Sequence, residues 1–237
     1  MLDLPLGMGI QAMKYNAISY EKGLENFRAT LAKATPSDMI AARLWYPVEA
    51  HGAVDSLAQQ YGVSYQTAAT IVAIVSPQCP WVDNVPKAGR ALAGDYTGID
   101  ACNRAKCKAY LSGFPQEWAR MVHGERRTYA VQPDAVLNSA KVWDFYRALM
   151  GDTSANCKDS HIANCWSAGR LGFADVMFEE VSKRGIELRS DVDRATIALA
   201  LDHGTDVRTM QALLWIVWRR HNASEQYDTP REFANGE

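Results

Sequence analysis

The helical character of this chain is clearest in LAQQYGVSYQTAATIVAIV, residues 57–75. Gly62 separates two segments with helical spacing of apolar residues, and Ser64 is a typical N-cap for the second. The pattern is that of a helix-turn-helix, but residues 68–75 are almost all apolar. A DNA-recognition helix instead presents several long polar or basic side chains to base edges. We therefore expect the second helix to lie in a hydrophobic core, and groove reading is the minor alternative.

Apolar residues at helical spacing recur along the rest of the chain, and no segment alternates polar and apolar residues as a strand would. Further helices are expected at 20–34, 38–46, 54–61, 139–150, 159–169, 173–184, 192–203 and 206–221. Pro36 should mark a break after the first of them. Pro47 should end the second, because proline disfavours helical backbone at the residue before it. Residues 94–135 are rich in glycine and proline, so loops around one or two short helices are expected there. We predict an all-α fold in which residues 1–237 form a single globular domain of many helices.

The composition is ordinary for a globular protein, with 48% hydrophobic and 22% charged residues in 237. No segment approaches the roughly 20 consecutive apolar residues of a membrane span. The N-terminus also lacks the basic region and apolar run of a secretion signal. We therefore expect a protein of the cytoplasm with no membrane partner.

The net charge of −2 gives the whole chain no general attraction to nucleic acid. Any contact with DNA must therefore be local. Residues 87–127 carry eight basic and four acidic residues. This segment could contact phosphates, or it could be an ordinary solvated helical surface.

The five cysteines form no CxxC pair, which fits neither a secreted disulfide framework nor a common zinc site. Reduced thiols are therefore expected. Cys157, His161 and Cys165 recur every four residues, and a metal site on one helical face is the minor alternative. No fourth ligand is evident, so we predict neither a metal nor another cofactor.

Two segments carry residues suited to a functional site. The first is the proline-bounded loop SPQCPWVDN, residues 76–84, in which Gln78, Trp81 and Asn84 could lie at a pocket rim. The alternative is that its prolines only stop a helix and that Trp81 fills the core. The second is KDSHIANCW, residues 158–166, where Asp159 or Ser160 is expected to cap a helix.

A carboxylate at this position lies at the positive end of the helix dipole. Asp159 could therefore stabilise positive charge on a substrate or orient a water molecule. The alternative is that Asp159 only caps its helix.

Taken in order, these segments resemble the helix-hairpin-helix DNA glycosylase superfamily, whose members have the endonuclease III-like fold. The similar segments are IVAIVSPQ, WVDNVPKAGRAL, SAKVWDFYRAL and KDSHIANCWSAGRLG, and the resemblance covers about residues 54–220. The layout is also similar to a group of bacteriophage proteins with SPQ-x-x-W-x-x-N, Lys-x-x-x-Phe, Asp-x-His and a closing Gln-Ala-x-x-Trp helix. The resemblance therefore implies a phage-type member of this all-α fold, active in the host cytoplasm.

The resemblance implies that Asp159 is the catalytic carboxylate and that His161 positions its segment. Lys141 is the third candidate catalytic residue. The candidate substrate-binding residues are Gln78, Trp81, Asn84 and Asn138. The implied partner is DNA, and the implied reaction is hydrolysis of the N-glycosidic bond of a flipped base.

The chain departs from the superfamily at three points. The glycine-rich hairpin before the catalytic segment is absent, and so is the lysine that this hairpin carries for strand cleavage. Lys141 or Lys158 would have to replace that lysine in a Schiff-base reaction. No cysteine follows Cys165, so the iron-sulfur loop is absent as well. Two alternatives therefore stay open, a phage enzyme that modifies a DNA base without excising it and a non-catalytic DNA-binding or inhibitor protein.

Overall fold

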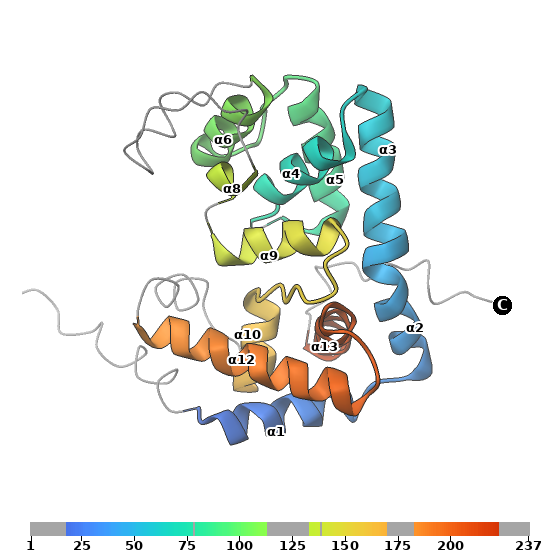
Figure 1. Cartoon of the computed structure of the whole chain (residues 1–237), viewed down its shortest axis with the longest axis vertical. Helices are drawn as coiled ribbons and strands as arrows, with labels where there is room; N and C mark the ends of the chain where they lie inside the picture. Colours follow the sequence, from blue (N-terminus) through green and yellow to red (C-terminus); the bar gives the residue numbers. More distant parts are fainter. Residues whose placement is uncertain (1–17, 78, 113–132, 138, 170–182, 223–237) are drawn as a thin grey trace, which may run out of the picture. The chain divides into compact units, whose positions relative to one another are not determined.

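The computed structural model describes residues 18–77, 79–112, 133–137, 139–169 and 183–222 (Figure 1). All regular elements in these ranges are helices, and none of the described residues forms a strand. The all-α prediction is confirmed. The chain divides into two compact units, one built from residues 1–42 and 158–237 and the other from residues 43–157.

The first unit is a bundle of helices from both ends of the chain. Its helices are α1 (Tyr20–Leu31), the start of α2 (Pro36–Leu44), α10 (Ser160–Ser167), α12 (Lys183–Asp202) and α13 (Val207–Asn222). Helix α1 contacts α10, α12 and α13. Figure 1 shows α1 (blue) lying along α12 (orange).

Trp166 of α10 is the largest side chain in the core of this unit, and none of it is exposed. The Phe27 and Trp166 rings pack in a T-shaped arrangement, with centroids 5.1 Å apart. The side-chain amide of Asn26 donates to the Trp166 carbonyl oxygen at 2.7 Å. Gly23 lies so close that a Cβ there would be only 2.0 Å from the Trp166 ring. The absence of a side chain at Gly23 therefore lets α1 and α10 pack closely.

Helix α2 begins at Pro36, earlier than the start after Ser37 that the sequence suggested. Thr35 and Asp38 form a capping box: Asp38 Oδ2 accepts from the Thr35 backbone N–H at 2.7 Å, and Thr35 Oγ1 accepts from the Asp38 N–H at 3.2 Å. Proline fits the first helical position because the N–H it lacks would have no partner inside the helix. The break predicted at Pro36 does separate α1 from α2, but Pro36 is the first residue of α2, so the predicted start after Ser37 was too late.

Asp38 is buried and forms an ion pair with Arg220 of α13. The same guanidinium donates to the Lys33 carbonyl oxygen at 2.7 Å. Burial alone would raise the pKa of Asp38. The hydrogen bonds from Thr35 and from Arg220 outweigh burial, and the pKa lies below its ordinary value. The end of α13 is thus tied to the start of α2.

We expect Arg220→Met to lower the free energy of unfolding by about 2 kcal/mol at pH 7, because a half-buried pair lies between exposed and fully buried pairs in strength. A lowered pKa stabilises the fold above the unfolded value of about 3.9, and this contribution is lost as the pH falls. The difference between wild type and variant should therefore shrink below about pH 4 in urea titrations. Arg28→Met is the control, because the Arg28–Asp202 pair is 3.8 Å long and exposed on both sides. An equal loss in both variants would contradict the prediction.

The second unit surrounds one buried helix. Its elements are the π-helix η2 (Trp45–Ala50), α3 (His51–Tyr61), α4 (Tyr65–Ile74), α5 (Trp81–Leu92), α6 (Ala101–Leu111), α8 (Pro133–Val136) and α9 (Ala140–Leu149). Helix α4 contacts α3, α5, α6 and α9, and all its residues from Ala68 to Ile74 are buried. The prediction of a core helix rather than a DNA-reading helix is confirmed. Ser64 caps α4, and Gly62 ends α3 in the left-handed conformation, as expected.

Pro47 does not end a helix as predicted. Residues Trp45–Ala50 form a π-helix that contains Pro47, and α3 follows it directly. The proline ring clashes with the carbonyl four residues earlier in a regular α-helix, and the wider π-turn relieves such a clash. Trp45 and Tyr46 lie in this turn and are buried.

The boundaries of the other expected helices agree with the sequence to within a few residues, except at α12. The loop expected at 76–84 is wrong in its second half, because α5 begins at Trp81, directly after Pro80. Helix α12 begins at Lys183, nine residues before the expected start at 192. The helix expected at 173–184 falls mostly outside the described residues, and its last two positions belong to α12. Within the described ranges, no helix is both long and apolar enough to cross a membrane.

Candidate active site

Asp159 is the N-cap of α10, as predicted. Its Oδ1 accepts hydrogen bonds from the backbone N–H groups of His161 and Ile162, at 2.9 and 3.0 Å. Ile162 and Trp166 anchor the helix in the core of the first unit. The Asp159 side chain therefore sits at a fixed helix start, half-buried rather than in the core.

The second carboxylate oxygen of Asp159 is held by another helix. Its Oδ2 accepts from the indole Nε1–H of Trp215, on α13, at 3.1 Å. The carboxylate is therefore not occupied by backbone capping alone. An ionised carboxylate can accept about four hydrogen bonds, and these contacts use three of them. Counting only donors in the described part of the chain, one acceptor position remains for a water molecule or a substrate group.

Two further polar side chains lie against the Trp215 ring. The His161 ring meets it edge to face, with centroids 6.2 Å apart and planes at 85°. The buried Arg219 guanidinium lies over the Trp215 ring, 4.5 Å from its centroid. We call Asp159, His161, Trp215 and Arg219 the α10–α13 cluster. It unites an anion, an imidazole and a guanidinium around one indole.

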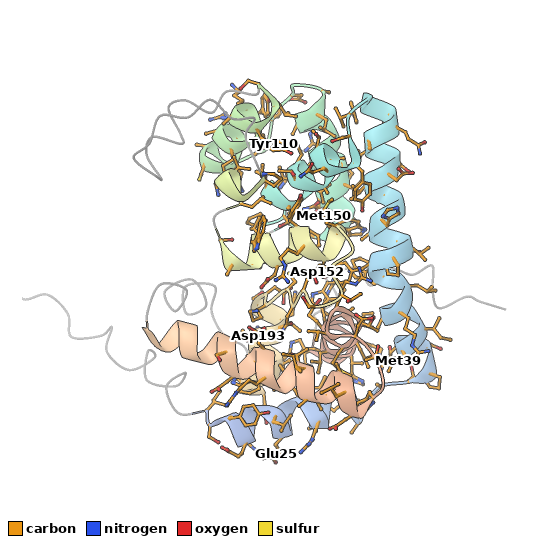
Figure 2. The ribbon with its side chains drawn as sticks, in the orientation of Figure 1. Glu25, Met39, Tyr110, Met150, Asp152 and Asp193 are labelled. Carbon is orange, nitrogen blue, oxygen red and sulfur yellow. The ribbon has the colours of Figure 1, made fainter. Side chains whose placement is uncertain are left out.

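Lys158, next to Asp159, is paired with α12. Its Nζ lies 2.7 Å from Oδ1 of Asp193, and only 14% of the Lys158 side chain is exposed. Figure 2 shows Asp193 on α12. An ammonium group engaged in this way is a poor nucleophile, because Schiff-base formation needs the free amine. The position of Lys158 thus does not favour it as a substitute for the missing lyase lysine.

Trp81, at the first position of α5, belongs to an aromatic cluster in the second unit. The centroid of its ring lies 5.5 Å from the centroid of the Trp45 ring and 6.3 Å from the centroid of the Phe145 ring, and both pairs have edge-to-face geometry. The Trp81 and Phe145 side chains are half-buried. Lys141 lies one helical turn before Phe145 on α9 and is also half-buried. The structure therefore places Trp81 beside Phe145, which shares one face of α9 with Lys141.

Asn84 is more deeply buried than a residue of a pocket rim, with 1% of it exposed. Its side-chain amide donates to the carbonyl oxygen of Val72 at 3.3 Å and so ties α5 to α4. Its Oδ1 has no hydrogen-bond partner among the described residues. Gln78 and Asn138 lie outside the described residues.

The predicted residues therefore fall into two groups. Asp159 and His161 lie together in the first unit, whereas Trp81, Asn84 and Lys141 belong to the second. Sequence analysis did not identify Arg219, although its i,i+4 spacing from Trp215 is a usable signal on a helix.

The metal interpretation of the cysteines gains no support from the described residues, among which no three His, Cys, Asp or Glu side chains group to hold an ion. The Cys165 thiol donates to Thr30 Oγ1 at 3.2 Å, and burial raises its pKa to about 12. The Cys157 thiol is directed to the Lys141 carbonyl oxygen at 3.8 Å. The Cys165 thiol stays protonated at neutral pH and is therefore a poor metal ligand.

The model of a family of unknown function (DUF7178) matches residues 10–222, so the chain belongs to this family. Comparison with curated proteins and with solved structures found no match.

Proposed function

We propose that this member of the DUF7178 family acts on a base in DNA, and that the Asp159 carboxylate assists cleavage of the bond between base and sugar. The observation that supports this most directly is the half-buried carboxylate at the start of α10, fixed by three N–H donors from two helices. The resemblance to helix-hairpin-helix glycosylases implies a catalytic carboxylate at this point of the chain.

The chemistry requires an anion close to the sugar. As the C1′–N bond breaks, its electron pair leaves with the base and positive charge develops on the sugar. The Asp159 carboxylate would stabilise this charge and accept a proton from the attacking water, whose oxygen then bonds to C1′. The departing base takes up a proton from solvent or from a neighbouring acid. The free acceptor position on Asp159 suits that water molecule.

A hydrolytic reaction fits better than a covalent one. Lys158 is engaged with Asp193, so water is the simpler nucleophile. Lys141, in the second unit, stays a candidate for contact with the substrate. DNA phosphates could be bound by the exposed basic side chains of α5 and α6, which are Arg90, Arg104 and Lys108.

The test is an assay of the purified full-length chain on single- and double-stranded oligonucleotides containing uracil, an oxidised purine or 5-hydroxymethyluracil. Base release leaves an abasic site, which alkali converts to a strand break. Intact mass spectrometry of the same samples detects any gain of mass on a base. We expect release of at least one base and no strand break before alkali.

The alternatives give different results in this assay. A gain of mass without base release would identify a base-modifying enzyme. Salt-dependent binding to the oligonucleotides with no change of mass would identify a non-catalytic DNA-binding protein. Absence of binding at any salt concentration would overturn the proposal of a DNA substrate.

A further inference from the structure

Among the described residues, two other aspartates directly precede a helix and accept hydrogen bonds from its first turn, and both use their second carboxylate oxygen locally. Asp100 accepts from the backbone N–H of Asn103 at 2.9 Å and from its side-chain amide at 2.7 Å. Asp206 accepts from the backbone N–H of Thr209 at 2.8 Å and from its hydroxyl at 2.9 Å. In both cases one residue of the first turn orients the whole carboxylate.

Asp159 differs because both local hydrogen bonds go to Oδ1. Its Oδ2 accepts from Trp215, which follows 56 residues later in the chain. Capping requires only one carboxylate oxygen. Rotation about the last side-chain torsion of an aspartate, χ2, costs little energy, so capping alone does not fix where the other oxygen faces. The Trp215 N–H therefore decides the direction in which Oδ2 faces, and this bond serves no capping function.

The Trp215 ring is itself held in place. The Arg219 guanidinium covers one face at 4.5 Å, one helical turn along α13. A cation over an indole face attracts the ring electrons, which makes the Nε1–H a stronger donor. The His161 ring packs in a T-shaped arrangement with the same ring. Arg219 can thus act on the carboxylate through Trp215.

We propose that Trp215 is the positioning residue for Asp159 and that Arg219 acts through the Trp215 ring. The inference rests on the proposed function, in which Asp159 meets the reacting sugar and water. If the carboxylate turns away from the reacting atoms, the rate of the chemical step falls but the substrate still binds. A small displacement of a catalytic group is enough to lower the rate strongly. The role of Trp215 should therefore be visible in kcat and not in KM.

The experiment compares Trp215→Phe with Trp218→Phe, because both tryptophans are half-buried on α13. Trp215→Phe keeps a ring but removes the N–H. We expect its kcat for base release to fall about 10- to 100-fold, with KM changed less than about 3-fold. Trp218→Phe should keep the wild-type values. Replacing Trp215 with benzothienylalanine, which has sulfur in place of the indole N–H, should match the Phe variant with less effect on packing.

Proton–nitrogen NMR of the indole groups gives a readout that needs no substrate. The Trp215 cross-peak, assigned by its loss in Trp215→Phe, should move in Asp159→Asn, whereas the Trp218 cross-peak should not. The inference would be overturned if Trp215→Phe keeps the wild-type kcat. It would also be overturned if the chemical shift of the Trp215 cross-peak does not change in Asp159→Asn. If the wild-type chain releases no base, the proposed function fails, and the cross-peak still decides whether Trp215 holds Asp159.

Discussion

Asp159→Asn should reduce base release by about 10³-fold, in the range typical of losing a group that stabilises transition-state charge. The substitution removes the anion but keeps the shape. Asparagine is as good an N-cap as aspartate, so its amide oxygen can still accept from the N–H groups of His161 and Ile162. Rates should be measured by single-turnover assays on the oligonucleotide that the wild-type chain processes.

Folding and DNA affinity should change little in this variant. The asparagine amide would face the Trp215 N–H in place of Oδ2, which costs about 1 kcal/mol of stability for one lost hydrogen bond. The DNA affinity should stay within about 3-fold, because phosphate contacts dominate it. Asp206→Asn is the matched control, since it makes the same change at the start of α13. Undiminished base release by Asp159→Asn would remove this carboxylate from the mechanism.

Gly23→Ala should lower the free energy of unfolding by about 3 kcal/mol, the upper range of overpacking in a core. Helix propensity alone would favour alanine by about 1 kcal/mol. The added Cβ would lie 2.0 Å from two atoms of the Trp166 ring, which is fully buried and cannot move aside. Chemical denaturation followed by circular dichroism gives the difference.

Two controls test the cause of this loss. Gly52→Ala, in α3, meets nothing within 4 Å and should be neutral or slightly stabilising. The clashing atoms belong to the six-membered part of the indole, so Gly23→Ala should cost less in a Trp166→Phe background. An equal loss in both backgrounds would show that the contact with Trp166 is not responsible.

Local signals in the sequence predicted much of this fold. Ser64, Ser139 and Asp159 each precede an apolar helical pattern, and each caps the helix that follows it. The apolar run at 68–75 predicted a buried helix because no face of it could be left in water. These features depend only on neighbouring residues, which is why the sequence contains them.

Features that depend on competing or distant interactions were missed. The sequence predicts helix ends at both prolines, but Pro36 is itself the first residue of α2 and Pro47 lies inside a π-helix. The bond between Asp159 and Trp215 joins two helices, and no local pattern encodes it. The resemblance drew attention to both residues without suggesting that they touch. The position of the Asp159 cap could thus be predicted, but its second anchor could not.

The first unit is assembled from two segments separated in the chain by residues 43–157. During synthesis on a ribosome, α1 therefore emerges long before α10, α12 and α13, against which it packs. The intervening unit is continuous and can fold as soon as it is complete. Helix α1, in contrast, keeps Phe27 exposed until α10, α12 and α13 have been synthesised. Packing between segments so far apart in the chain forms slowly, and the apolar surface that stays exposed meanwhile favours aggregation. A chaperone that shields the N-terminal helix should therefore raise the yield of folded protein more than one that acts on the middle of the chain.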